Sequence, residues 1–174
     1  MSLAHVKEFF EGYEEARKNN DMISYYNNTA GDYDKVLDDT GYENITDYCS
    51  ILLMENLKNE FKETAANEFQ VLDVGCGSGK TGVSLQKSGF TIIDGVDPAK
   101  QMLVIARSKN VYRDAVEGIL TDNEKFNLED SKYDGVLSVG CFTVGHITLQ
   151  NGVPEFLRLL KDCLLYTSPS PRDS

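Results

Sequence analysis

The chain has 174 residues, of which 41% are hydrophobic and 26% charged, and its formal net charge at pH 7 is -11. This length suits one domain with one core. Proteins that bind nucleic-acid phosphates present a basic face, so the acidic balance argues against a nucleic-acid partner. No apolar run reaches the roughly 20 residues of a membrane-spanning helix, and the charged N-terminus does not look like a signal peptide. We therefore expect no membrane association and a cytoplasmic location, with the nucleus as an alternative.

The cysteines and histidines are few and scattered. No C-x-x-C pair is present, and the histidines do not cluster with the cysteines. Zinc sites need such clusters, so we expect no metal site, and we interpret the cysteines as reduced thiols of an intracellular protein. The residues concerned are Cys49, Cys76, Cys141, Cys163, His5 and His146.

The first 62 residues have the spacing of helices. Apolar side chains recur at intervals of three and four over residues 4–18 and from Ile45 to Phe61, which predicts two amphipathic helices. Between them, DMISYYNNTAGDYDKVL (21–37) is rich in Tyr, Asn and Asp, and it is typical of a turn between short helices. We interpret residues 1–62 as an N-terminal helical cap.

From residue 63 the pattern changes to strands alternating with helices. FQVLDV (69–74) is a short apolar run that stops at glycines, as a buried parallel strand does. This alternation predicts an α/β fold: a Rossmann-like, doubly wound parallel sheet over residues 63–162 with helices on both faces. The further strands are expected at 90–97, 117–120 (EGIL) and 132–140, and the helices at 80–88, at 99–109 after Pro98, and at 153–161, opened by Pro154.

The stretch VLDVGCGSGKTG (71–82) fits three ligand-binding patterns. A P-loop needs four residues between its glycines, which would place the first glycine at residue 74. Residue 74 is Val, and Gly75 leaves only three residues before Gly79. The spacing therefore argues against a P-loop, and we expect Lys80 on the first turn of a helix, in solvent.

The other two patterns are distinguished by whether their ligand can lie next to a carboxylate at the glycine loop. The dinucleotide pattern G-x-G-x-x-G begins only at Gly77, two residues after the expected turn glycine. The D-x-G-x-G-x-G pattern of S-adenosylmethionine (SAM) methyltransferases starts at Asp73, whose carboxylate would repel a pyrophosphate but could pair with the ammonium of SAM. Asp97, eighteen residues after Gly79, could accept both ribose hydroxyls in either case. SAM is thus the predicted cofactor, with an NAD-binding oxidoreductase as an alternative.

At this point the sequence resembles the class I SAM-dependent methyltransferases, through VLDVGCGSG, GVDPAKQML and LTDNEKFNLEDSKYDGVLSVG. The closer likeness is to the methyltransferase-like proteins of the Williams–Beuren syndrome region, through YNNTAGDYD, LQKSGF, KNVYRDAVEG and VGCFTVGHI. The resemblance covers roughly residues 22–162. It implies a methyl acceptor that is a small molecule or a protein. A non-catalytic SAM-binding protein remains an alternative, and the oligomeric state stays open.

The resemblance also implies roles for particular residues. The methionine end of SAM would lie on the glycine loop, the ribose on the acid that ends the second strand, and the adenine between side chains that follow the second and third strands. Two tyrosines would cover the cofactor, and a glycine past the fourth strand would border the methyl-transfer chamber. The methionine end is thus assigned to Asp73, Gly75, Cys76 and Gly77, and the ribose to Asp97. The adenine is assigned to Pro98, Met102, Asp122 and Asn123. The covering tyrosines are Tyr26 and Tyr33, and the glycine at the chamber is Gly140.

A general base is needed only when the acceptor is protonated at the working pH. His146 follows the fourth expected strand and is the candidate base in this region, although a histidine there can equally be structural.

The end of the chain breaks the α/β pattern. Residues 163–173 match the translation of a transposase-type sequencing adaptor, so we expect the native sequence to stop near Asp162 and residues 163–174 to be a non-native tail. The resemblance implies a sheet of order 3-2-1-4-5-7-6, of which the chain would hold strands one to four. The fourth strand would then be an apolar edge, so we expect low stability.

Overall fold

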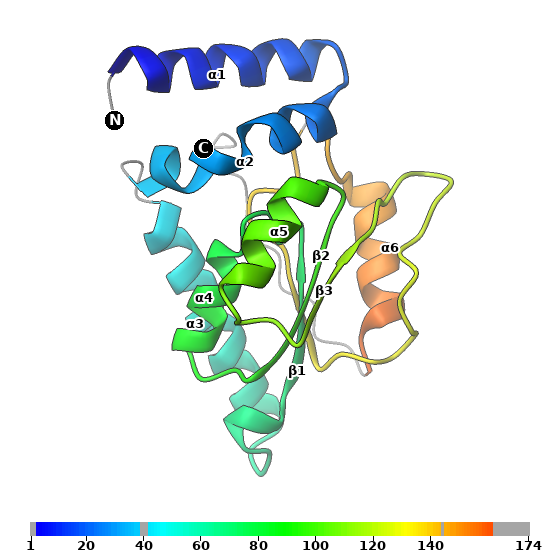
Figure 1. Cartoon of the computed structure of the whole chain (residues 1–174). Coiled ribbons are helices and arrows are strands. Elements are labelled where there is room, and N and C mark those ends of the chain that lie inside the picture. Colours follow the sequence, from blue (N-terminus) through cyan, green and yellow to red (C-terminus); the bar gives the residue numbers. More distant parts are fainter. Residues whose placement is uncertain (1–2, 39–41, 144, 162–174) are drawn as a thin grey trace.

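The computed structural model describes residues 3–38, 42–143 and 145–161. Its centre is a parallel sheet of order β3-β2-β1-β4, which confirms the predicted α/β class (Figure 1). The chain moves outward from β1 to β2 and β3, and then returns to the other side of β1 for β4. Ligands of such sheets bind where the order reverses, at the carboxyl ends of the strands. The strands are β1 (Gln70–Val74), β2 (Ile92–Asp97), β3 (Asp114–Glu117) and β4 (Gly135–Leu137).

Helices cover both faces of the sheet, as the alternating pattern predicts (Figure 1). On one face, α3 (Tyr42–Glu60) packs against β4 and α4 (Lys80–Lys87), α4 packs over β2, and α5 (Lys100–Ser108) packs against β2 and β3. On the other face lies α6 (Leu149–Leu159), whose Phe156 and Leu159 are fully buried against Leu72 and Val136. Successive residues of each strand point to opposite faces, so a single strand supplies both cores.

The first two helices, α1 (Leu3–Lys18) and α2 (Met22–Asp38), lie across the end of the sheet where the strands finish (Figure 1). The expectation of a turn over residues 21–37 was wrong, because α2 is one continuous helix. Its buried residues include Met22, Tyr25 and Val36, and α2 packs on both α1 and α5. Tertiary packing of this face outweighs the weak helix propensity of its Asn and Asp residues.

Three other elements differ from the sequence expectation. The fourth strand was expected at 132–140, but β4 spans only Gly135–Leu137, the residues that pair with β1. The third strand was expected at 117–120, but β3 ends at Glu117, where its pairing with Asp97 of β2 ends. Helix α6 was expected to open at Pro154, but it begins at Leu149 behind a capping box in which Thr148 and Asn151 bond each other's backbone N–H. Such a cap satisfies two otherwise unpaired donors, so it sets the helix start more firmly than a proline does.

Among the described residues, β4 is the last strand on one side of the sheet, as the order of strands predicts. Immediately after α6, Leu160 forms a parallel bridge with Tyr133, and the Lys161 N–H donates to the Tyr133 carbonyl over 2.8 Å. The adaptor-like residues 163–174 lie outside the described residues. The domain boundary at residue 62 stays a prediction; on its N-terminal side, Leu53 and Leu57 of α3 belong to the core of the sheet.

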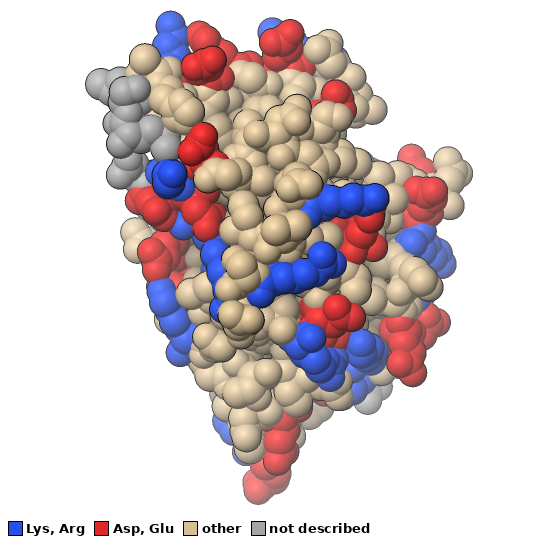
Figure 2. Space-filling view, viewed as in Figure 1, with Lys and Arg blue, Asp and Glu red and all other residues tan. Residues whose placement is uncertain are grey.

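Charges on the surface are mixed. On the face seen in Figure 2, lysines and arginines lie among acidic residues and form no continuous basic surface. Lys100 pairs with Glu117 over 3.4 Å, and Arg113 with Asp94 over 2.6 Å. Within the described parts of the chain, no helix is both long and apolar enough to cross a membrane.

Candidate functional site

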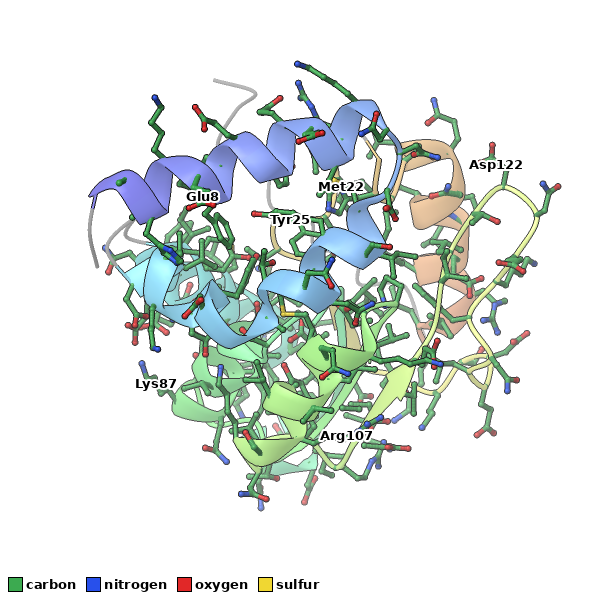
Figure 3. All side chains as sticks on the ribbon, turned by 45° about the horizontal axis from the view of Figure 1, so that its top comes forward. Glu8, Met22, Tyr25, Lys87, Arg107 and Asp122 are labelled. Carbon is green, nitrogen blue, oxygen red and sulfur yellow. The ribbon has the colours of Figure 1, made fainter. Side chains whose placement is uncertain are left out.

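A cavity of about 520 Å³ lies at the carboxyl ends of the strands, beneath α2. Its walls come from α2, the glycine loop after β1, the end of β2, the loop after β3 and the segment that follows β4. Met22 of α2 and Asp122 of the loop after β3, both labelled in Figure 3, line it from separate elements. Ten predicted site residues line the cavity: Tyr26, Tyr33, Gly75, Gly77, Asp97, Pro98, Met102, Asp122, Gly140 and His146.

The glycine loop turns sharply away from β1. Gly75 has a φ of 70° and Gly77 a φ of 51°, in the left-handed region that side chains other than glycine rarely adopt. The Gly75 N–H donates to the Val96 carbonyl over 2.8 Å, which ties the loop to β2. A Cβ atom on Gly75 would also overlap Cys141 Sγ, so the backbone of the loop and the segment after β4 are in close contact.

Asp97 ends β2, as predicted, and lies beside the loop. Its Oδ2 accepts from the Gly77 N–H and its Oδ1 from the Ala99 N–H, each over 2.8 Å. The residue is 8% exposed. Burial raises the pKa of its carboxyl to about 6, while the two backbone N–H groups limit the rise. Each carboxylate oxygen keeps a further lone pair, so Asp97 can still accept hydrogen bonds from a ligand in the cavity.

Asp73 lies behind the glycine loop and not in the cavity lining. Its side chain is fully buried in β1. Oδ2 accepts from the Tyr112 hydroxyl over 2.7 Å, whereas Oδ1 has no partner among the described residues. Burial raises the pKa of this carboxyl to about 7, against the Tyr112 hydrogen bond, which lowers it, and the nearby charge of Asp97 raises it further. A buried carboxylate with an unpaired oxygen costs free energy until a cation or donor approaches it.

Of the residues expected around an adenine, three line the cavity and one does not. Pro98 and Met102 line the cavity just after β2, and Met102 is 2% exposed. Asp122 lines the opposite wall and accepts from the Asn151 side chain over 3.3 Å. Asn123 is exposed and does not line the cavity. Cys76 is also outside the lining, buried against α5 and β3.

Three aromatic rings close the cavity from the side of α2. The Tyr26 hydroxyl lies 2.9 Å from His146 Nε2, and the two rings meet edge to face with centroids 5.6 Å apart. Tyr33 packs on Tyr26 with centroids 5.8 Å apart. Burial raises the pKa of both phenols well above the usual value, so both remain protonated. Gly140, past β4, has a φ of 76° and faces Tyr42.

Several residues of the site were not anticipated from the sequence. Tyr42 lines the cavity and donates to the Val139 carbonyl over 3.2 Å. Cys141 also lines it, and burial raises the pKa of its thiol to about 12. Tyr112 supports Asp73 from behind. Tyr112 lies in KNVYRDAVEG, one of the stretches that resemble the family, but the resemblance assigned it no role. No local pattern places a tyrosine next to a carboxylate 39 positions away in the sequence.

The last two glycines of the dinucleotide pattern have packing roles. A Cβ on Gly82 would overlap the Tyr112 ring, and one on Gly79 would crowd Ala106. Lys80 begins α4, as expected, but it does not lie free in solvent. Its side chain is 16% exposed and pairs with Asp38 of α2. Residues 21–37, expected as a turn between short helices, belong instead to the continuous helix α2, whose last residue, Asp38, lies beside Lys80.

The comparisons with known proteins agree with this architecture. A family model described as "Methyltransferase domain" matches residues 71–163. A parallel sheet of order 3-2-1-4, with a glycine loop after β1 and an acid at the end of β2, is the doubly wound arrangement that binds adenosine-containing cofactors, and the solved structures with this fold include SAM-dependent methyltransferases. The chain belongs to this methyltransferase family.

Individual relatives are more distant. A candidate methyltransferase of Geobacillus sp. (strain WCH70) is 31% identical over 119 residues, which are 68% of this chain and 42% of that protein. A candidate SAM-dependent methyltransferase of Methanococcus maripaludis has the same fold, with a TM-score of 0.58 at 23% identity over 81% of this chain and 62% of that one. A chain from a complex between the Haloferax volcanii Trm112 methyltransferase activator and a candidate methyltransferase gives a TM-score of 0.56 at 20% identity, over 78% and 55%. This chain thus spans less than two thirds of each relative.

Proposed function

We propose that this chain forms the cofactor-binding part of a SAM-dependent methyltransferase that acts on a small molecule or a protein. The observation that carries the proposal is the charge of the cavity. Among the described residues that line it there are three aspartates, Asp21, Asp97 and Asp122, and neither lysine nor arginine. NAD and ATP bring phosphates that such a wall repels, whereas SAM brings an ammonium and a sulfonium and no phosphate.

The residues present fit the cofactor. The charge of Asp73, whose Oδ1 has no partner among the described residues, suits an ammonium group on the cavity side of a loop whose glycines allow close approach of a ligand to the backbone. Asp97 would bind the ribose hydroxyls. Bound SAM supplies an activated methyl group on a sulfonium, and the protein contributes alignment and a water-poor cavity. We assign the methionine end also to Gly75, Cys76 and Gly77, and the adenine to Pro98, Met102, Asp122 and Asn123, of which Cys76 and Asn123 would have to act from outside the lining.

His146 is the proposed general base, and Tyr26 would orient it. The 2.9 Å contact between the Tyr26 hydroxyl and His146 Nε2 fixes the imidazole ring at the cavity wall next to Gly145. Replacement His146→Gln keeps a hydrogen-bonding side chain but removes the base, so transfer to a protonated acceptor should fall roughly a hundredfold. SAM affinity should stay unchanged, and unchanged turnover would reject the assignment.

Within the family, we propose that the chain groups with the methyltransferase-like proteins of the Williams–Beuren syndrome region. The phrases YNNTAGDYD and VGCFTVGHI support this: the first supplies Tyr26 and Tyr33, and the second supplies Gly140 and His146, all four of which line the cavity. Tyr33 and Tyr26 would cover the cofactor, and Gly140 would border the chamber in which the methyl group is transferred.

Isothermal titration calorimetry of the chain with SAM, S-adenosylhomocysteine, NAD and ATP tests the proposal. We expect binding of the first two ligands alone. Binding of NAD or ATP alone would favour an oxidoreductase or a nucleotide-dependent enzyme instead. A screen for methylated small molecules and proteins then separates an enzyme from a non-catalytic SAM-binding protein.

A further inference from the structure

Tyr112 reaches the back of the glycine loop from the connection between α5 and β3. Its hydroxyl donates to Asp73 Oδ2 over 2.7 Å and accepts from the Gly82 N–H over 3.1 Å. Gly82 is the third residue of α4, so this N–H is one of the donors that a helix N-terminus leaves unpaired. A side chain at Gly82 would overlap the Tyr112 ring. The fold therefore keeps a space in α4 through which this phenol reaches Asp73.

The surroundings of Asp73 offer little other support for a negative charge. In the part of the chain that the structure describes, the ionisable groups that face Asp73 are all acids, and no lysine, arginine or histidine is among them. These groups are Asp97 of β2, Cys76 of the glycine loop, Cys141 after β4, Tyr42 of α3 and Tyr112 itself. Tyr112 supplies the one side-chain hydrogen bond recorded to Asp73 among these residues.

We propose that Tyr112 is a positioning residue that holds Asp73 oriented and ionised behind the glycine loop, where its charge attracts the cationic amine of the cofactor. The inference rests on the proposed function. Asp73 does not line the cavity, but in a buried, water-poor setting a charge acts across several ångströms without direct contact. The Gly82 N–H, at the positive end of α4, polarises the phenol and strengthens its donation to the carboxylate.

Removal of the hydroxyl has a predictable direction. The Tyr112 hydrogen bond lowers the pKa of a carboxyl that burial raises to about 7. Without it, Asp73 stays protonated to a higher pH and loses its attraction for an amine near neutrality. The ring of Phe would still fill the space next to Gly82, so the packing of α4 and α5 should persist.

The test uses two ligands that differ in the amine. S-adenosylhomocysteine carries the amino-acid group, and 5′-methylthioadenosine shares the adenosine and the sulfur but lacks it. In calorimetry at pH 7, Tyr112→Phe should weaken S-adenosylhomocysteine roughly tenfold, the effect of losing a hydrogen bond to a charged group. Its affinity for 5′-methylthioadenosine should be unchanged. For S-adenosylhomocysteine, the loss should shrink as the pH is raised to 9.

Tyr133 provides a matched control. It is another buried tyrosine whose hydroxyl donates to a buried carboxylate, Asp94 Oδ2 over 2.9 Å, on the opposite face of the sheet. Tyr133→Phe should lower thermal stability but leave the affinity ratio of the two ligands as in the wild type. Asp73→Asn should reduce the ratio as Tyr112→Phe does, and the double variant should lose no more than Asp73→Asn alone, since both changes remove one interaction.

Equal weakening of both ligands by Tyr112→Phe would overturn the inference and leave a purely structural role. Unchanged binding of S-adenosylhomocysteine would overturn it too. In both cases the proposed function stands, because the wild type binds the ligands. A wild-type chain that binds neither ligand would instead overturn the proposed function and this inference with it. The affinity ratio is measured within each variant, so a partial loss of stability does not obscure the result.

Discussion

Two aspartates three residues apart on β2 have opposite environments. Asp94 accepts hydrogen bonds from Arg113, Lys132 and Tyr133 over 2.6–3.0 Å. Burial raises its pKa, but these bonds outweigh that effect and the net pKa is lowered. Asp97 receives only two backbone N–H bonds among the described residues, and its pKa is raised to about 6.

The difference separates structural charge from functional charge. Asp94 is neutralised by Arg113 and Lys132 and lies on the face that carries α6, outside the cavity lining, so its charge serves the fold and not a ligand in the cavity. Asp97 and Asp73 lie near the carboxyl ends of the strands, and neither has an ion pair with a lysine or arginine among the residues that the structure describes. Uncompensated buried carboxylates are costly, and they persist where a ligand completes them.

The largest expected effect that tests this comparison is on ligand affinity. Asp97→Ala should weaken S-adenosylhomocysteine roughly a hundredfold, because two hydrogen bonds from the ribose to a charged acceptor are lost. Asp94→Asn should leave the affinity within about twofold, since Asp94 lies outside the cavity lining. Calorimetry on both variants gives the answer, and a similar loss in the two would abolish the distinction.

The second effect is on the free energy of unfolding, and here Asp94 is the residue whose replacement has the effect. Asp94→Asn should lower the free energy of unfolding by about 2 kcal/mol, because Arg113 and Lys132 lose a charged partner while retaining solvent contact. The pKa of Asp94 is lowered in the folded state, so this contribution is present above the unfolded pKa of about 3.9 and is lost as the pH falls through the folded value. Urea unfolding at pH 7 and pH 3 measures it: the difference between wild type and variant should shrink at the lower pH.

A third effect is the pH dependence of stability that comes from Asp73 and Asp97, which is opposite in sign to that from Asp94. Their folded pKa values, about 7 and about 6, exceed the unfolded value of about 3.9, so their stabilising contribution is fully present below about pH 3.9 and is lost as the pH rises from there through the folded values. Ligand binding should follow the reverse course. The affinity for S-adenosylhomocysteine should rise roughly tenfold between pH 6 and pH 8 as Asp73 releases its proton. A flat profile across this range, with enthalpies corrected for buffer ionisation, would contradict the environment described for Asp73.

The smallest effect concerns Lys80, a charged residue near the same end of the sheet whose ion pair lies at the surface. Lys80 pairs with Asp38, whose side chain is 58% exposed. Lys80→Met should change the free energy of unfolding by less than about 1 kcal/mol and leave ligand affinity unchanged. Loss of binding in this variant would mean that Lys80 acts on the ligand after all, as a P-loop lysine would.

The sequence predicts those parts of the site that follow from chain order. Asp97 ends its strand and the glycine loop follows β1, because short buried runs and glycines identify the ends of strands locally. These positions then meet at one edge of a parallel sheet. The order of strands around β1 and the places of Pro98 and Met102 near the cavity came instead from the resemblance to the methyltransferase family, and the structure agrees with both.

What the sequence does not predict depends on contacts between distant segments. Helix α2 forms because α1 and α5 cover its apolar face, and β3 ends where its pairing with β2 ends. Cys141 meets Gly75 across 66 positions, and Tyr112 meets Asp73 across 39. Residue type and local spacing give no information about such pairs, so these contacts become visible only in the folded structure.

The overlap of Gly82 with the Tyr112 ring also bears on inheritance. A relative that replaces Gly82 by a larger residue has no room for a tyrosine at the position of Tyr112, so the two positions should change together over evolutionary time. In lineages that keep the pair, a glycine spacing that mimics a dinucleotide fingerprint is preserved by a neighbouring aromatic ring. Genome surveys that search for that fingerprint alone would then assign such chains to the wrong class of enzyme.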